Sequence, residues 1–138
     1  MSFANGFFAG TILVVLTSAA LAQTPTPTPA LTRTVVARGD VSVPGREAVA
    51  ARVEVAPGGA SGWHTHPGDE ISVVNEGEVV LMVAGQPPRK VVAGEGFVIP
   101  AGVAHNARNE GTSPTRLVGV YVVEKGKPLA SPASAPTP

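Results

Sequence analysis

All three histidines of this chain, His64, His66 and His105, lie in two short segments punctuated by glycine and proline. Glu70 follows His66 by four residues. Three imidazoles and one carboxylate form a complete ligand set for a single transition metal ion. No fourth histidine is left for proton transfer, so acid–base chemistry would rest on Glu70 itself or on a metal-bound hydroxide.

The spacing of these residues constrains the strands that must position them. His64 and His66 are two residues apart, so both imidazoles leave the same face of an extended segment. A turn at 67–68 would let Glu70 fold back toward the same point. His105 must arrive on a separate strand, and the turn at 100–102 just before it would aim that strand at the site.

The same residue types also occur in proteins that bind no metal. A lone histidine is most often a surface side chain or a hydrogen-bonded one, and a His-x-His pair also arises by chance in exposed strands. Asp69 competes with Glu70 as the carboxylate, although strand parity places it on the opposite face. The histidines alone therefore leave both a metal site and a structural role open.

Composition narrows the class of protein. The 138 residues include ten basic and ten acidic side chains, no cysteine and 43% hydrophobic residues, which is typical of a folded protein. The lack of cysteine excludes disulfides, thiolate metal ligands and a thiol nucleophile. Balanced charge without a basic run gives no reason to expect a nucleic acid partner, so a small-molecule or metal-centred role is favoured.

The N-terminus predicts export. Residues 7–21 are nearly all apolar or small, and the pattern Ala20-Leu21-Ala22 precedes Gln23, so residues 1–22 resemble a signal peptide cleaved after Ala22. Residues 1–6 depart from that pattern because they contain no Lys or Arg. The alternative is an uncleaved anchor, but a run of about 15 residues is shorter than the roughly 20 needed to span a membrane. We expect a periplasmic or secreted protein with no stable membrane span after cleavage.

Two Pro-rich segments frame the expected domain. Residues 23–30 are typical of a Thr/Pro-rich disordered linker and residues 131–138 of a Pro-rich disordered tail. The folded unit is then 31–130, which is long enough for one small core. Nine Val-rich segments between turn signals predict strands and no helix, which indicates a sandwich or barrel with a central hairpin at 73–83. The expected strands are 34–38, 48–55, 62–66, 70–75, 78–83, 89–92, 96–99, 104–108 and 116–123.

The pattern around the histidines is more specific than the histidines themselves. Ten fixed positions at matching spacing, with 16 residues between the two motifs, make the segment 58–109 similar to the cupin superfamily, in particular to its small single-domain bacterial members. The first motif is Gly58, His64, His66, Glu70 and Gly77, and the second is Gly94, Pro100, Gly102, His105 and Asn109.

This resemblance implies a fold and a site. The fold would be all-β, a small double-stranded β-helix (jelly-roll) barrel of two antiparallel sheets. The metal ligands would be His64, His66, Glu70 and His105, with Asn109 in a structural, turn-capping role. In an octahedral ion the four ligands leave two positions open for water, dioxygen or a bidentate substrate. The motif glycines would occupy tight or positive-φ positions, and Pro100 would fix the approach to His105.

Two functional classes follow from the resemblance. One is a metalloenzyme of the oxygenase, isomerase or decarboxylase type that acts on a small organic molecule, and the other is a non-catalytic module that binds a metal or small ligand. The cofactor would be one divalent transition metal, Mn, Fe, Ni, Cu or Zn. A homodimer through an edge strand is also expected, with 34–38 as the candidate edge.

The few aromatic residues limit what else can act at the site. Tyr121 is a candidate acid or base, although packing is the commoner role of an aromatic in a terminal strand. Phe97 and Ile99 are expected to line the barrel wall, and Trp63 to cover the outer core. A cavity lined mainly by Ala and Val suits a small polar or aliphatic substrate.

Overall fold

The computed structural model describes residues 30–137, which form ten strands and no helix. The predicted signal peptide and nearly all of the predicted linker lie outside the described residues. Within 30–137 no helix is long and apolar enough to cross a membrane. The strands are β1 (Leu31–Asp40), β2 (Arg46–Val55), β3 (His64–Thr65), β4 (Gly68–Glu76), β5 (Glu78–Val83), β6 (Arg89–Val92), β7 (Gly96–Ile99), β8 (His105–Arg108), β9 (Thr115–Glu124) and β10 (Ser131–Pro132).

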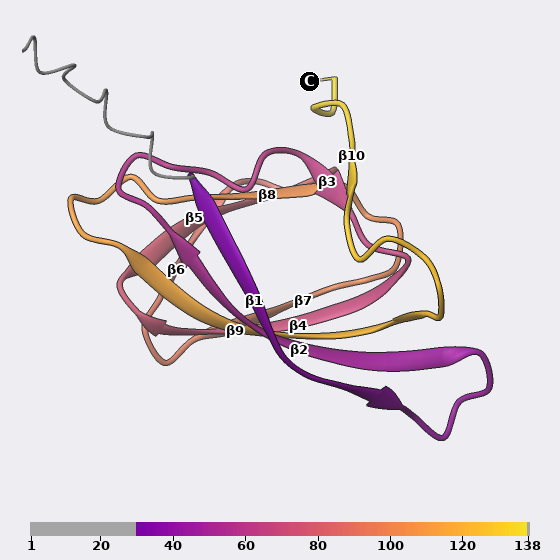
Figure 1. Cartoon of the computed structure of the whole chain (residues 1–138). Coiled ribbons are helices and arrows are strands. Elements are labelled where there is room, and N and C mark those ends of the chain that lie inside the picture. Colours follow the sequence, from indigo (N-terminus) through magenta and orange to yellow (C-terminus); the bar gives the residue numbers. More distant parts are fainter. Residues whose placement is uncertain (1–29, 138) are drawn as a thin grey trace, which may run out of the picture.

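The strands form two five-stranded sheets that face each other (Figure 1). One sheet has the order β1-β2-β9-β4-β7 and the other has the order β10-β3-β8-β5-β6. Every strand pairing is antiparallel, so both sheets can bury one face and expose the other. The predicted fold class, an all-β jelly-roll barrel of two antiparallel sheets, is confirmed.

All nine expected strands are present, and three of them, β5, β6 and β7, have the predicted bounds. The tenth, β10, falls in the segment expected to be a disordered tail, where Ser131 and Pro132 pair with Thr65 and His64 of β3. Pro132 is tolerated there because β10 is an edge strand and needs to donate few hydrogen bonds. The limits of the domain and of the remaining tail stay predictions.

The expected central hairpin at 73–83 is wrong. Strand β4 belongs to one sheet and β5 to the other, so the turn between them is a corner of the barrel. Gly77 makes this corner with a φ of 79°, and Thr115 Oγ1 donates a hydrogen bond to Glu78 O at 2.7 Å across it. Alternation of apolar residues reports which face of a strand is buried, but not which sheet the strand joins.

The barrel interior contains two apolar clusters that occupy different positions along the strands. A larger apolar cluster includes Val74 of β4 and Leu117 of β9, and a smaller one includes Tyr121 and Val123 of β9. On the inward face of β4, the two positions that precede Val74 are Ser72 and Glu70. Both are polar and both are buried. The core therefore fills one end of the barrel with aliphatic side chains and leaves a polar layer beyond it.

Candidate metal centre

Three histidines and one carboxylate meet in this polar layer, and we call the four residues His64, His66, Glu70 and His105 the candidate metal centre. His64 in β3 lies directly opposite His105 in β8, and His66 follows β3. Glu70 comes from β4 in the other sheet. The site therefore joins the two sheets, and the structure brings together all four residues that the sequence singled out.

Strand parity explains why these four side chains point inward. All four are at most 9% exposed, whereas Thr65, between the first two histidines, and Asp69, before Glu70, are more accessible. Asp69 is exposed, and its Oδ1 accepts a hydrogen bond from Ala101 N at 3.0 Å. Asp69 thus anchors the 100–102 turn that precedes His105, on the opposite face from Glu70.

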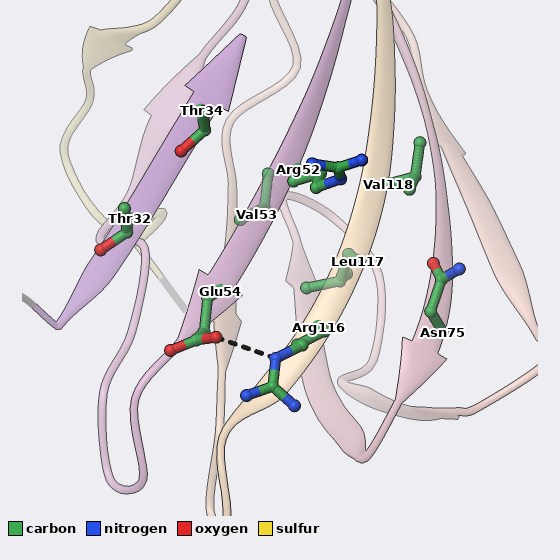
Figure 2. A pocket seen from close by; sticks show the side chains of 9 residues that line it. All are labelled: Thr32, Thr34, Arg52, Val53, Glu54, Asn75, Arg116, Leu117 and Val118. Atoms are coloured by element: carbon green, nitrogen blue, oxygen red, sulfur yellow. Dashed lines mark hydrogen bonds and ion pairs between the residues drawn. The ribbon is translucent and has the colours of Figure 1, made fainter. Parts of the chain in front are cut away.

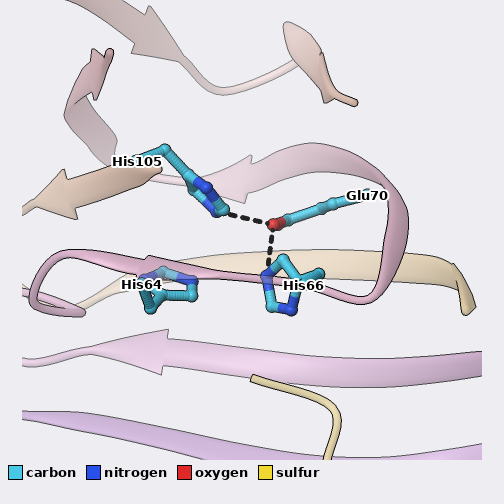
Figure 3. Close-up of side chains that lie close together, drawn as sticks. All are labelled: His64, His66, Glu70 and His105. Carbon is cyan, nitrogen blue, oxygen red and sulfur yellow. Dashed lines mark hydrogen bonds and ion pairs between the residues drawn. The ribbon is translucent and has the colours of Figure 1, made fainter. Parts of the chain in front are cut away.

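The ligand atoms converge on one point (Figure 3). Glu70 Oε2 lies 2.9 Å from His66 Nε2 and 3.0 Å from His105 Nε2. All four ligand atoms of the candidate metal centre lie within 4.8 Å of one another. Bonds of about 2.1 Å to a transition metal place adjacent octahedral ligands about 3.0 Å apart, so the two separations from Glu70 Oε2 fit such an ion.

Backbone carbonyls fix the tautomer of each histidine. Nδ1 of His64 donates to Gly62 O at 2.8 Å, and Nδ1 of His105 donates to Val103 O at 3.0 Å. Nδ1 of His66 donates to Leu129 O, which lies just before β10. Because a carbonyl only accepts, each Nδ1 carries the proton and each Nε2 presents a lone pair to the site.

The charges and lone pairs of the candidate metal centre favour the binding of a cation. Burial opposes ionisation of Glu70, but contacts with His105, His66 and Ser72 outweigh it and hold its pKa well below the usual range, an effect that needs a proton or a positive charge on the histidine side of the carboxylate. Burial is also the main reason that the pKa of His64 is lowered to about 4, so this imidazole is neutral at pH 7. Among residues 30–137, His66 Nε2 is buried without a hydrogen-bond partner. Lone pairs and a carboxylate crowded together repel unless a positive ion lies between them, and this donor set fits a divalent metal.

Ser72 and Tyr121 support the centre from the sheet that carries Glu70. Ser72 Oγ donates to Glu70 Oε1 at 2.6 Å, which leaves Oε2 to face the histidines. The Tyr121 ring lies 4.7 Å from the His66 ring, centroid to centroid. Burial and the nearby Glu70 carboxylate raise the pKa of Tyr121 to about 12, against the opposing effect of Arg33.

Gly119 makes room for Tyr121. A Cβ at position 119 would lie 2.7 Å from the Tyr121 hydroxyl oxygen, so any larger side chain would push the phenol out of place. The two residues share the inward face of β9, where Gly119 pairs with Ser72 and Tyr121 pairs with Glu70. Tyr121 therefore lies against the candidate metal centre while it also belongs to the smaller apolar cluster.

The remaining residues expected near the site can be placed as well. Asn109 is structural as expected: its Nδ2 donates to Val55 O and Ser113 O, and its Oδ1 accepts from Gly111 N. Phe97 and Ile99 are buried in the larger apolar cluster, in agreement with a wall position. No sequence signal points to Arg33, which lines the site, because Arg33 lies in β1, outside both motifs.

Two of the hollows formed by residues 30–137 differ in character. The larger, about 450 Å³, opens on the outer face of the β1-β2-β9-β4 sheet, where Glu54 and Arg116 already pair with each other at 2.9 Å (Figure 2). The smaller, about 30 Å³, is lined by His64, Glu70, His105 and Tyr121 inside the barrel. The inner cavity is lined by three groups whose pKa values are shifted largely by their buried surroundings, His64, Glu70 and Tyr121, so it is the candidate site despite its size.

Comparison with known proteins agrees with the fold. Residues 51–123, more than half of the chain, match the family described as the cupin domain, and the chain belongs to the cupin family. Germin-like protein 5-1 from Oryza sativa subsp. japonica is 40% identical over 87 residues, which cover 56% of this chain and 38% of that protein. The chain spans only about a third of the length of the curated relatives it matches.

Solved structures show the same architecture. A recombinant oxalate oxidase in complex with glycolate superposes with a TM-score of 0.56 and 31% identity, covering 67% of this chain and 50% of that chain. A protein with a double-stranded β-helix domain from Klebsiella pneumoniae subsp. pneumoniae MGH 78578 has a TM-score of 0.61 and 23% identity over 78% of this chain and 90% of that chain. The second likeness concerns the fold alone.

Proposed function

We propose that this cupin is an exported metalloenzyme that acts on a small organic molecule at the candidate metal centre. The observation that carries the proposal is the convergence of three Nε2 lone pairs and one carboxylate, all buried, with every Nδ1 held by a backbone carbonyl. Support for a small ligand comes from the likeness to an oxalate oxidase that was solved with glycolate.

In this proposal His64, His66, Glu70 and His105 hold one divalent ion, Mn, Fe, Ni, Cu or Zn. When bound, the ion supplies Lewis-acid or oxygen-activating chemistry, which suits oxidation, isomerisation or decarboxylation. The protein contributes orientation and exclusion of water. Ser72 holds one oxygen of Glu70, and Tyr121, which keeps its proton at neutral pH, offers a hydroxyl donor beside the site.

Proton transfer is the second role that we assign to Glu70. Its Oε2 faces two histidine nitrogens, and no fourth histidine exists in the chain to act as a base. Tyr121, with its raised pKa, is a donor and a poor base at pH 7. We therefore place acid–base work on Glu70 in preference to Tyr121.

The alternative is a module that binds a metal or a small ligand without turnover. One observation favours it, because an inner cavity of about 30 Å³ has room for little more than one water molecule. The two functions separate in one experiment. The exported protein is purified from its compartment, its metal content is determined, and it is screened against small acids, diketones and phenols.

One metal ion per chain with turnover of a small acid supports the enzyme. Stoichiometric metal with a tightly retained ligand and no turnover supports the binding module. If the protein carries no metal, and if His66→Ala leaves the melting temperature in added metal unchanged, the metalloenzyme and the metal-binding module both fail.

Export and assembly complete the proposal. We propose that residues 1–22 are removed after Ala22, that 23–30 is a linker and 31–130 the cupin domain, and that the product is periplasmic or secreted. N-terminal sequencing of the exported protein tests the cleavage site. A homodimer is proposed through β1, which is an edge strand with Val35 and Val36 about half exposed. A monomer by light scattering at micromolar concentration would contradict this assembly.

A further inference from the structure

Arg33 is a cation at the candidate metal centre that the proposed function leaves without a role. It lies in β1 opposite Val53 of β2, and Val53 is buried in the core. Paired residues in an antiparallel sheet point to the same side, so Arg33 faces the barrel interior. Its neighbours Thr32 and Thr34 line the hollow on the other side of the sheet (Figure 2).

The charge of Arg33 has no protein counterion. Within residues 30–137, its Nε is buried without a hydrogen-bond partner, and no carboxylate lies within ion-pair distance of its guanidinium. The guanidinium carbon lies 5.6 Å from the centroid of the Tyr121 ring, and this contact offsets part of the cost of burial. A half-buried cation without an ion-pair partner lowers the stability of the fold, and it can form an ion pair with an anionic ligand.

Arg33 lines both the inner cavity at the candidate metal centre and a larger hollow beside it. Arg33 lines the inner cavity of about 30 Å³ together with Glu70 and His105. It also lines a hollow of about 380 Å³ together with Trp63 and Ser131. Leu31, Ser61 and His64 line both spaces as well, so the two are neighbours. A molecule in the outer hollow therefore contacts Arg33 and His64, and both of these residues also line the inner cavity.

We propose that Arg33 binds the carboxylate of a small organic acid whose other end reaches the candidate metal centre. This inference rests on the function proposed above and names its substrate class. A guanidinium forms two parallel hydrogen bonds with a carboxylate. A divalent ion, Glu70 and Arg33 together carry a net positive charge, which attracts an anion into the cavity. The small inner space restricts the reacting end of the acid to a few atoms.

The test measures binding separately from turnover. The full chain is loaded with one metal ion, and the dissociation constants of oxalate and of its neutral analogue oxamide are determined by calorimetry. Arg33→Gln is expected to raise the dissociation constant of oxalate about 10- to 100-fold, since hydrogen bonds to a charged group are among the strong ones. Binding of oxamide should change little. Arg33→Lys keeps the positive charge but loses the guanidinium that forms two parallel hydrogen bonds. It should therefore bind oxalate more tightly than Arg33→Gln and more weakly than the wild type.

The matched control is Arg52→Gln, which removes an exposed arginine of β2 that lines the hollow on the outer face of the sheet. It should leave oxalate binding unchanged. Arg33→Gln should keep or raise the melting temperature, because it removes an unpaired, partly buried charge. Unchanged oxalate affinity in metal-loaded Arg33→Gln would overturn the inference, as would wild-type protein that binds oxalate no better than oxamide. Failure to load metal would instead overturn the proposed function, and the measured metal content distinguishes the two failures.

Discussion

At the scale of single residues, the candidate metal centre depends on groups that never touch a metal. Ser72 turns one oxygen of Glu70 away from the histidines, and three backbone carbonyls set the tautomers of the imidazoles. Groups of this kind typically alter metal affinity or activity by about 10- to 100-fold when they are changed. The chemistry of the site is therefore distributed over the strands that surround it.

Tyr121 gives a direct spectroscopic test of the site's environment, since it is the one tyrosine in the sequence. Its pKa is raised from 10.0 to about 12 by burial and by Glu70. A raised tyrosine pKa means that the folded state holds the proton more tightly than the unfolded state, so the stabilisation is present below pH 10 and is lost as the pH rises toward 12. Ultraviolet titration of the native protein should show one tyrosinate transition near pH 12.

The same titration of Glu70→Gln should show a lower midpoint, because the neighbouring negative charge is gone. A native midpoint at pH 10 would show that Tyr121 is exposed and would remove it from the site.

At the scale of elements, strand parity and turn chemistry account for most of what the sequence predicts. The His-x-His spacing places two imidazoles on one face of the extended segment that begins with β3, and Glu70 takes the inward position that Asp69 does not. Positive φ is found at all four motif glycines, Gly58, Gly77, Gly94 and Gly102, as the motifs imply. Local rules are sufficient there because each one concerns residues close together in sequence.

What the sequence could not predict comes from distant segments. The carbonyl of Leu129 holds His66 across 63 positions, and Arg33 reaches the cavity from the edge strand β1. Neither residue belongs to a motif, and a Pro-rich segment such as 131–138 normally speaks against a strand. The sequence also could not predict that β4 and β5 belong to different sheets. The alternation of apolar and polar residues along a strand does not indicate which sheet the strand joins.

The terminal strand β10 is predicted to strengthen metal binding. Ending the chain after Pro128 removes Leu129 O, the acceptor of His66 Nδ1, and the pairing of β10 with β3. Metal affinity should fall about 10- to 100-fold, as for other groups that orient a ligand. Competition with a chelator measures the affinity, and fluorescence of Trp63, whose carbonyl accepts from Ala133 N, reports the loss of contact.

The control truncation ends after Ala133, which keeps β10 and both contacts. It should bind metal like the full chain. Equal affinity in both truncations would mean that the C-terminal segment does not orient His66.

At the scale of the whole molecule, a barrel of about 100 residues carries a polar, ionisable layer inside its core, and its stability must depend on pH. The pKa of His64 falls from 6.5 to about 4 on folding, mainly through burial. Below pH 6.5 the unfolded chain takes up a proton that the folded chain refuses, so stability declines as the pH falls from 6.5 to about 4. Glu70, whose pKa is also lowered, adds a loss in the same direction at lower pH.

Metal-free protein should therefore unfold at lower urea concentration at pH 5 than at pH 7, and bound metal should raise the urea midpoint at pH 7. The control is His64→Asn, in which an amide can replace the hydrogen bond from Nδ1 to Gly62 O without titrating. This variant should show a smaller change in the urea midpoint between the two pH values. Equal changes in both proteins would contradict a buried, neutral His64.

The central claim is that Glu70 and the three histidines bind one metal ion, and neighbouring carboxylates allow a matched test. Wild type, Glu70→Gln and Asp69→Asn are exposed to metal, separated from free ion by gel filtration, and analysed for metal per chain. Glu70→Gln keeps the shape of the side chain and loses a charged ligand, so its affinity should fall more than about 100-fold, beyond the effect of groups that only orient ligands. Wild type and Asp69→Asn should retain one ion per chain and Glu70→Gln should retain little. Equal retention by Glu70→Gln and wild type, or none by wild type, would contradict the claim.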